Sequence, residues 1–122
     1  DGAIRGIDMF DSVLPTRIAR KGTLMTSKGR IVITNSKYKN DFSLIDPETE
    51  DYGSQNFTKA YLHHLFKADE LYAQNIASVH NLRYLLKLME DMRQAIAEDR
   101  LLEFREEVMA NYGYNNANAR LF

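Results

Sequence analysis

The chain of 122 residues is long enough for one ordinary domain, and its 44% hydrophobic and 27% charged residues are typical of globular proteins. Its formal net charge of −1 excludes the overall basic field of many nucleic-acid-binding proteins, so any RNA contact must come from a local patch. The sequence contains no cysteine, which excludes disulfides and thiolate metal sites. No apolar run approaches the roughly 20 residues of a membrane span. No secretory signal is visible and the first residue is Asp1, so we expect an excised or processed chain without a membrane partner.

The first part of the chain is predicted to be mainly extended. Residues 11–22 are expected to form a loop, because Pro15 interrupts regular structure. Gly29 tolerates the positive φ of a hairpin connection, and residues 36–56 are polar and expected to be irregular. Short apolar or β-branched segments predict three strands, at residues 6–10, 23–26 and 30–35.

The second half of the chain shows the i, i+3, i+4, i+7 apolar spacing of amphipathic helices, and three are predicted. Asn56 or Thr58 is expected to cap the first helix and Ser78 the second, while Gly113 is expected to end the third. The predicted core-facing stripes are Phe57, Tyr61, Leu65, Ala68 and Tyr72; then Leu82, Leu85, Leu86, Met89, Met92 and Ile96; then Leu101, Phe104, Val108 and Tyr112.

Two acids and two arginines stand out in residues 6–20, which read GIDMFDSVLPTRIAR. Asp8 and Asp11 lie three residues apart, so a strand would place them on opposite faces unless it ended between them. From the residues alone, Asp11 is a strand-end or turn residue, and Arg17 and Arg20 are solvated loop cations.

The same segment resembles the last barrel strand and following loop of bacterial tRNA-guanine transglycosylases, enzymes of queuosine formation, and the rest of the chain resembles their C-terminal part. The resemblance implies that Asp11 is the nucleophile. Its carboxylate would attack C1′ of the ribose as guanine leaves, and the incoming base would displace the enzyme from the covalent tRNA intermediate. Arg17 and Arg20 would contact the anticodon loop, a task that suits the planar guanidinium fork. Ser12 stands where the family usually has cysteine, and a cytoplasmic location is expected.

A second match concerns a zinc site. Residues 46–65 read DPETEDYGSQNFTKAYLHHL, where the family carries Cys-x-Cys-x-x-Cys, with a zinc-binding histidine further on in a His-Asn-Leu triplet. By this resemblance the three cysteine positions are Thr49, Asp51 and Ser54, while His80 remains in place.

Hydroxyl groups are poor zinc ligands, so we predict no tightly bound zinc and no other cofactor. Asp51 and Ser54 are expected to serve as helix caps instead. The alternative is a weak carboxylate–histidine metal site made of Glu48, Glu50, Asp51 and His80.

The adjacent histidines His63 and His64 point about 100° apart on a helix, so they cannot both face one metal ion. We expect His64 to be partly buried near Tyr61 and His63 to be solvated.

The expected fold is α+β: the last strand of a (β/α)8 barrel, a small antiparallel hairpin and a three-helix C-terminal subdomain. The expected divisions are 1–22 for the barrel strand and active-site loop, 23–114 for a zinc-subdomain-like unit lacking its zinc ligands, and 115–122 for a mobile tail. Active sites of such barrels collect loops from many strands, so the groups that recognise guanine and the acid–base partner would lie outside this chain. The chain alone is therefore predicted to be inactive.

Three interpretations remain open. The first is a transglycosylase C-terminal domain that needs a complementary barrel chain, with a homodimer contact in the same region. The second is an engineered, metal-free and cysteine-free scaffold or self-associating domain without catalysis, although a natural zinc-free branch would also explain the missing cysteines. The third is a separate RNA-binding domain, against which the near-neutral charge argues. Its patch would be Arg17, Arg20, Lys21, Lys28 and Arg30.

Overall fold

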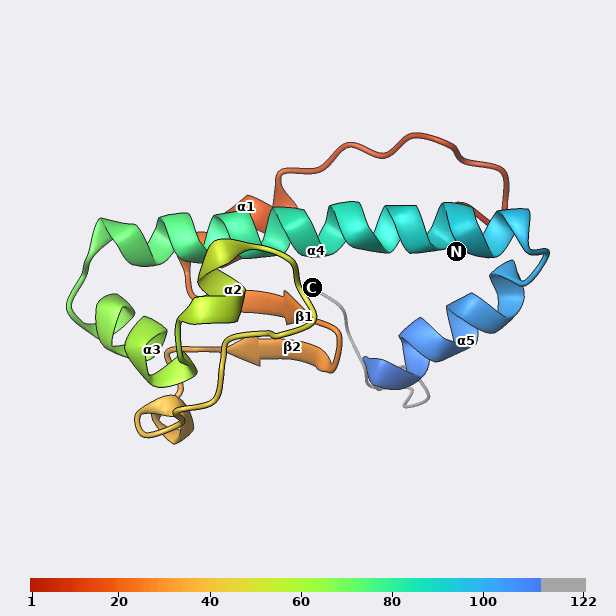
Figure 1. Ribbon diagram of the computed structural model, residues 1–122. Coiled ribbons are helices and arrows are strands. Elements are labelled where there is room, and N and C mark those ends of the chain that lie inside the picture. Colours follow the sequence, from red (N-terminus) through yellow and green to blue (C-terminus); the bar gives the residue numbers. More distant parts are fainter. Residues whose placement is uncertain (113–122) are drawn as a thin grey trace.

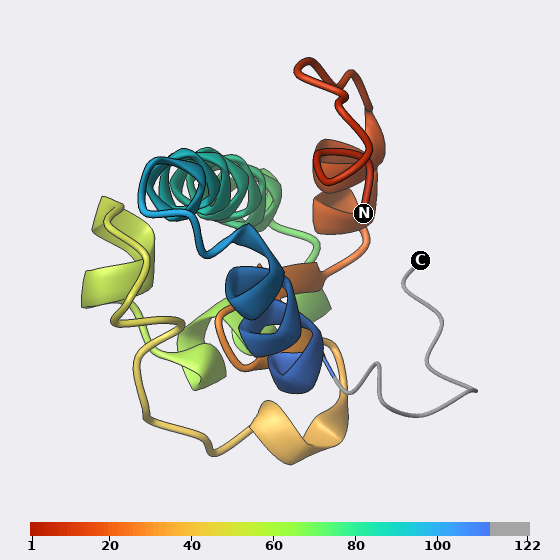
Figure 2. The ribbon, with the colours of Figure 1, turned by 90° about the vertical axis from the view of Figure 1, so that its right-hand side faces the viewer.

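The computed structural model describes residues 1–112. The long helix α4 runs along the molecule, and the other elements are arranged around it (Figure 1). Seen along α4, the N-terminal segment and α1 lie on one side of this helix, and the remaining elements lie below it (Figure 2). The combination of helices with one antiparallel hairpin confirms the mixed α and β composition. In chain order the elements are α1 (Leu14–Arg20), β1 (Thr23–Thr26), β2 (Gly29–Val32), the 3-10 helix η1 (Ser36–Tyr38), α2 (Tyr52–Asn56), α3 (Lys59–Lys67), α4 (Leu71–Ala97) and α5 (Leu101–Asn111).

Residues 6–10 form no strand, so the prediction of a strand there is wrong for this chain. The sheet found among residues 1–112 has two strands, β1 and β2, and residues 6–10 pair with neither. A strand needs neighbouring strands for its N–H and C=O groups, and here Gly6 N and Ile7 N donate instead to Ala3 O and Gly2 O in a local turn. It runs instead as an extended trace beside α4 (Figure 1). Met9 is 87% exposed and Phe10 52% exposed.

The predicted loop at 11–22 is also wrong, because most of it forms α1. Pro15 does not interrupt this helix, since it lies in the first turn, where a backbone N–H has no helical partner. Pro15 and Ala19 are buried, while Arg17 and Arg20 on the other side of the helix are exposed.

The predicted hairpin is confirmed, with a shorter second strand than expected. Thr26 pairs with Gly29, whose φ of +111° allows the two-residue connection between them. The strand β2 ends at Val32, and Ile33 N donates to Gly22 O at 2.8 Å, which continues the antiparallel register by one pair. The segment 36–56, expected to be irregular, contains the short helices η1 and α2.

The first predicted helix is shorter than its apolar stripe suggested, because α3 ends at Lys67 and Tyr72 belongs to α4. Thr58 caps α3, accepting a hydrogen bond from Tyr61 N at 3.0 Å, which confirms one of the two expected caps. The chain then leaves the helix, with Asp69 in the left-handed region at φ 56°, and α4 begins at Leu71. Ser78 therefore lies inside α4 rather than at its start, so the predicted cap there is wrong.

The apolar stripe predicted for residues 82–96 is not the main core face of α4. Leu82, Leu86 and Ile96 are exposed, and Leu85, Met89 and Met92 are only partly buried. The helix is apolar on more than one side, and its smaller side chains allow close approach to α1 and β1. The residues of α4 that are buried are Ala73, Ile76, Ala77, His80, Asn81 and Ala95.

The third predicted helix is confirmed as α5, which buries Phe104. The predicted stop at Gly113 and the predicted mobile tail at 115–122 lie outside the described residues. The two adjacent histidines exchange their expected roles: His63 is buried with its Nδ1 2.7 Å from Ile33 O, and His64 is exposed. The central core consists of Ala19, Leu24, Ile33, Tyr38, Ile45, Leu62, Leu65, Ala73, Ile76 and Ala77.

Candidate functional site

The residue predicted to be the nucleophile, Asp11, is exposed on the extended segment that enters α1. Two side chains shape this entry. Ser12 Oγ accepts a hydrogen bond from Leu14 N at 3.1 Å, and Thr16 Oγ1 donates to Val13 O at 3.1 Å. Ser12, at a position where cysteine was expected, therefore stabilises the turn that follows Asp11.

The arginines expected to contact RNA lie together on the outer face of α1. Arg17 and Arg20 are three residues apart, which places them on the same side of a helix, and both are exposed. The inner face of α1 is held in place through Pro15 and Ala19, and Asn81 Nδ2 in α4 donates to Pro15 O at 2.9 Å. The packing of α1 on α4 therefore directs both guanidinium groups to solvent.

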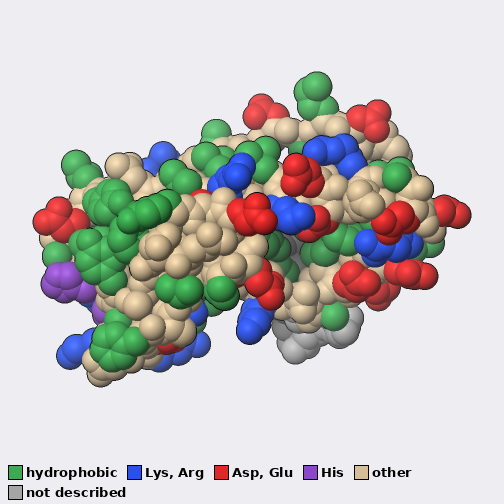
Figure 3. Space-filling view, in the orientation of Figure 1, with side chains coloured by type: hydrophobic (Ala, Val, Ile, Leu, Met, Phe, Trp, Pro, Cys, Tyr) green, Lys and Arg blue, Asp and Glu red, His purple; other side chains and the backbone are tan. Residues whose placement is uncertain are grey.

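Charge is unevenly distributed along the chain. The segment 12–40 contains no Asp or Glu, whereas α5 and the turn before it are rich in both. In Figure 3, Asp and Glu gather at the right over α5, and Lys and Arg lie around η1 at the lower left. All five cations of the predicted patch are exposed, and the acid-free segment contains further exposed cations. The exposed cations of the segment are Arg17, Arg20, Lys21, Lys28, Arg30, Lys37 and Lys39.

The predicted zinc-ligand positions lie on the segment 49–54, which runs into α2, and on the facing side of α4. Ser54 Oγ lies 2.6 Å from His80 Nδ1, and Asp51 Oδ1 lies 3.9 Å from the same nitrogen. Asp51 caps α2, its Oδ2 accepting from Ser54 N at 3.2 Å, as expected. Ser54 is not a cap, because its hydroxyl bonds to His80 instead. Thr49 is buried, and its carbonyl accepts from Asp51 N at 2.9 Å.

The hydrogen bonds of His80 assign its tautomer. Its Nε2 lies 2.7 Å from Met25 O, and a carbonyl can only accept, so Nε2 carries the proton. Nδ1 then accepts from the Ser54 hydroxyl. Burial lowers the pKa of His80, opposed by the hydrogen bond to Met25 and by the charges of Asp46 and Asp51. His80 is therefore neutral near pH 7.

These residues do not fit zinc. Structural zinc sites use four thiolate or imidazole ligands, and the four positions here offer two hydroxyls, one carboxylate and one imidazole. The Nδ1 lone pair of His80 is already used by Ser54. Within residues 1–112, no three His, Cys, Asp or Glu side chains are close enough to hold a metal ion. Glu48 and Glu50 of the alternative metal site are exposed.

Asn81 is the important polar residue that the sequence analysis missed. Its Oδ1 accepts from Met25 N at 2.9 Å, and its Nδ2 donates to Pro15 O at 2.9 Å and to Thr23 O at 3.0 Å. Asn81 and His80 together bind the backbone N–H and C=O groups on the outer edge of β1, to which a third strand would otherwise bond. The position of Asn81 directly after His80 was the one sequence signal that could have predicted this role.

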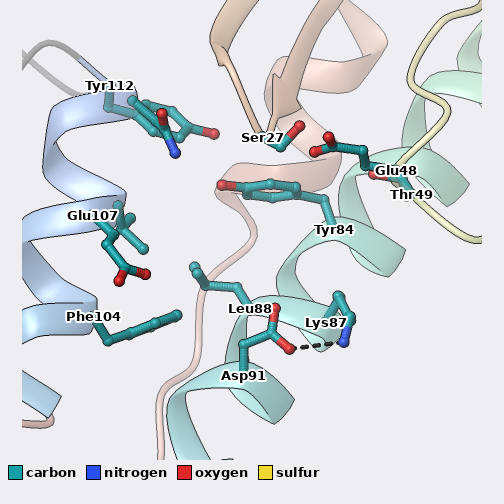
Figure 4. Close-up of a pocket in the computed structure, with 12 residues that line it drawn as sticks. Ser27, Glu48, Thr49, Tyr84, Lys87, Leu88, Asp91, Phe104, Glu107 and Tyr112 are labelled. Carbon is teal, nitrogen blue, oxygen red and sulfur yellow. Dashed lines mark hydrogen bonds and ion pairs between the residues drawn. The ribbon is translucent and has the colours of Figure 1, made fainter. Parts of the chain in front are cut away.

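A cavity of about 310 Å³ lies between α4, α5 and the loop after the hairpin. Figure 4 shows the ring of Tyr84 across it, with Glu48 on one side and Glu107 on the other. Lys87 Nζ and Asp91 Oδ1 form an ion pair of 2.7 Å at its edge, and burial raises the pKa of Tyr84. Thr49 lines this cavity, but Asp11, Arg17 and Arg20 do not, so it is separate from the predicted RNA-contacting residues.

An aromatic cluster lies on the surface formed by α2, α3 and the start of α4. The ring of Phe57 contacts Tyr52, Tyr61 and Tyr72, with centroids 5.6, 5.1 and 6.0 Å away. The three tyrosines remain exposed, Tyr52 by 71%. Side chains of this kind appear as a green area at the left of Figure 3. Exposed groups of aromatic residues are typical of protein interfaces.

Comparison with known proteins gives a consistent assignment. A model of the queuine tRNA-ribosyltransferase family matches residues 1–114. Proteins described as queuine tRNA-ribosyltransferase from Geobacillus thermodenitrificans and Lactococcus lactis subsp. cremoris are each 57% identical over all 122 residues, and that from Lysinibacillus sphaericus is 56% identical. The chain spans 32% of the length of each of these curated relatives. No helix within residues 1–112 is long and apolar enough to cross a membrane.

Proposed function

Because the chain belongs to the queuine tRNA-ribosyltransferase family, we propose that it provides the nucleophile and part of the tRNA site of a tRNA-guanine transglycosylase. Asp11 is the nucleophile in this proposal, and Arg17 and Arg20 bind the anticodon loop. The observation that carries it is the match over residues 1–114, which includes all three of these residues. Since the proposed substrate is tRNA, we also propose a cytoplasmic location for the protein.

The proposed chemistry is a double displacement at the ribose of the wobble guanosine. The Asp11 carboxylate attacks C1′, the bond from C1′ to guanine breaks, and the base leaves with its electron pair. The incoming base then attacks C1′ from the opposite face and releases the carboxylate, so the configuration at C1′ is retained. An exposed carboxylate on a segment fixed by α1 is accessible to a large RNA substrate, which supports this role.

Binding of tRNA is supported by the charge distribution. Arg17 and Arg20 share one face of α1, and the acid-free segment 12–40 carries further exposed cations on other elements. Each phosphate contact contributes to an affinity that falls with salt. The two arginines therefore place positive charge close in sequence to Asp11, although the overall net charge is −1.

The chain does not complete a transglycosylase site by itself in this proposal. It spans 32% of its relatives' length, and the groups that recognise guanine would come from the remainder. Exposed apolar side chains support a complementary partner of this kind. Met9, Phe10 and Val13 beside Asp11 are all more than half exposed, as is Leu86 on α4. We propose that a barrel polypeptide, equivalent to the rest of the relatives, covers them.

A homodimer contact is proposed for the aromatic cluster of Tyr52, Phe57, Tyr61 and Tyr72. Its exposed rings, with Val79 continuing the apolar surface along α4, provide the kind of patch that proteins bury on association. Native mass spectrometry of the chain and of Tyr61→Glu tests this contact. A dimer that becomes a monomer supports it, and a wild-type monomer contradicts it.

Guanine exchange tests the proposed activity. This chain would replace the matching 32% of the Geobacillus thermodenitrificans relative, and incorporation of labelled guanine into tRNA would be measured. We expect the chimera to be active and Asp11→Asn to reduce exchange by at least about a thousandfold, as is usual for loss of a nucleophile. Asp69→Asn is the matched control, since Asp69 is exposed and its left-handed backbone also suits asparagine.

Three results would decide between this proposal and the alternatives. Full exchange by the Asp11→Asn chimera would contradict the nucleophile assignment. An inactive chimera that folds would favour a domain without catalysis, engineered or natural, as the absence of cysteine first suggested. Exchange by the 122-residue chain alone would contradict the need for a partner.

A further inference from the structure

We propose that a hydrogen-bonded cluster of Ser54, His80 and Asp51 replaces the structural zinc that the family resemblance implies, and that the same backbone forms a zinc site once three cysteines are restored. The proposal concerns stability and metal content, so it is independent of the proposed activity. It rests on the arrangement of the loop at 46–54 against α4 and β1.

The cluster connects three parts of the fold. Ser54 in α2 bonds through Oγ to His80 Nδ1 at 2.6 Å, and His80 in α4 donates through Nε2 to Met25 O in β1 at 2.7 Å. Ser54 and His80 are both fully buried. A structural metal at the four positions would join the segment 49–54 to α4, and here the Ser54–His80 hydrogen bond does so, while the His80–Met25 bond extends the connection to β1.

The loop around the cluster is held by further local hydrogen bonds. Asp46 Oδ1 accepts from Glu48 N at 3.0 Å, and its Oδ2 accepts from Thr49 Oγ1 at 2.8 Å. Asp51 then caps α2 through Oδ2. The loop therefore has its own side-chain supports, which are hydrogen bonds accepted by the carboxylates of Asp46 and Asp51.

One polar atom of the cluster has no hydrogen-bond partner. Asp51 Oδ1 is buried and unsatisfied, and it points to His80 Nδ1 from 3.9 Å. In a tetrahedral zinc site, a thiolate and an imidazole nitrogen lie about 3.6 Å apart, given the usual bond lengths. The position of Asp51 relative to His80 is thus close to that of two ligands of one metal ion. The segment 49–54 and His80 therefore face each other at the positions where the cysteines would be restored.

The first test is the metal content and thermal stability of the chain as purified. We expect less than about 0.1 zinc per chain, and no change in Tm with EDTA or with added zinc chloride, because the donor set does not fit. About one zinc per chain, or a fall in Tm on adding EDTA, would overturn the proposal.

The second test restores the ligands. The triple variant Thr49→Cys, Asp51→Cys, Ser54→Cys should bind about one zinc per chain tightly, with a Tm that rises with zinc and falls with EDTA. Adding His80→Gln to this variant should weaken zinc binding at least about tenfold, because one of four ligands is lost. Cobalt(II) provides a spectroscopic check, since its visible absorption distinguishes tetrahedral thiolate coordination. A triple variant that folds without binding zinc or cobalt overturns the claim of a retained geometry.

A milder variant keeps the proposal testable if the triple variant does not fold. Ser54→Ala removes the hydroxyl and leaves His80 Nδ1 without its hydrogen-bond donor, so the Tm should fall by several degrees, about the change expected from the loss of one buried hydrogen bond. Gln55→Ala, an exposed position in the same helix, is the control and should leave Tm unchanged. Equal Tm values for Ser54→Ala and the wild type would contradict a stabilising role for the cluster.

Discussion

Asn81 joins α4 to α1 and β1 through one buried side chain. It bonds to the backbone of Pro15, Thr23 and Met25. We predict that Asn81→Ala lowers the free energy of unfolding by about 3 kcal/mol, because three buried backbone groups lose their partner. Urea denaturation measures the change. Asn75→Ala, exposed on the same helix, should change it by less than about 0.5 kcal/mol. Equal effects of the two variants would contradict the role given to Asn81.

His80 makes the stability of the chain depend on pH. Burial lowers its pKa below the ordinary value of 6.5, so the unfolded chain takes up a proton at a higher pH than the folded chain. Stability is therefore complete above about pH 7 and falls as the pH drops below about 6.5, by at most about 1.4 kcal/mol per pH unit.

The matched variants His80→Gln and His64→Gln separate this effect from other titrations. Denaturation between pH 7.5 and pH 5.0, a range chosen around the ordinary imidazole pKa, should show a shallower pH dependence for His80→Gln alone. His64 is exposed and its replacement should leave the wild-type slope. The same slope in all three proteins would show that His80 does not control it.

Among the elements, those encoded by local signals could be predicted from sequence. Gly29 supplies the positive φ of the hairpin, Thr58 caps α3, and Phe104 anchors α5. The failures have non-local causes. Residues 6–10 have strand-like side chains, but a strand also needs partners, and α1 depends on burial of Pro15 and Ala19 against α4.

The two apolar sides of α4 explain why its core face was misassigned. Periodicity finds apolar stripes but does not say which stripe faces this chain's own core. We predict that Leu86→Gln, at a position 60% exposed, changes the free energy of unfolding by less than about 0.5 kcal/mol. Leu62→Ala in the central core should cost about 3 kcal/mol. Urea denaturation compares them, and a large loss with Leu86→Gln would contradict the assignment of the exposed side.

For the whole molecule, the candidate site was accessible to sequence reasoning only in part. The resemblance of residues 6–20 to the family implied roles for Asp11, Arg17 and Arg20, and these roles stay predictions. It did not predict that α1 would present the arginines, since the Pro15 signal suggested a loop. Nor did it predict the Ser54–His80 hydrogen bond, which joins residues 26 positions apart.

The arginines should affect tRNA binding by the chimera rather than its fold. We predict that Arg17→Ala and Arg20→Ala each weaken tRNA binding about tenfold, the effect of one charge-assisted hydrogen bond, and reduce the salt dependence of binding. Arg93→Ala, an exposed arginine on α4, should do neither. Filter binding at several salt concentrations measures both quantities. If all three variants bind tRNA equally well, the assignment of Arg17 and Arg20 to the RNA site is wrong.

The most direct test of the central claim is to identify the residue that becomes bound to tRNA. The chimera would be incubated with tRNA without an incoming base, denatured, digested with nuclease and protease, and analysed by mass spectrometry. We predict a ribose adduct on the peptide that contains Asp11, and no adduct in Asp11→Asn. An adduct on any other residue, or one that persists in Asp11→Asn, would contradict the assignment of Asp11 as the nucleophile.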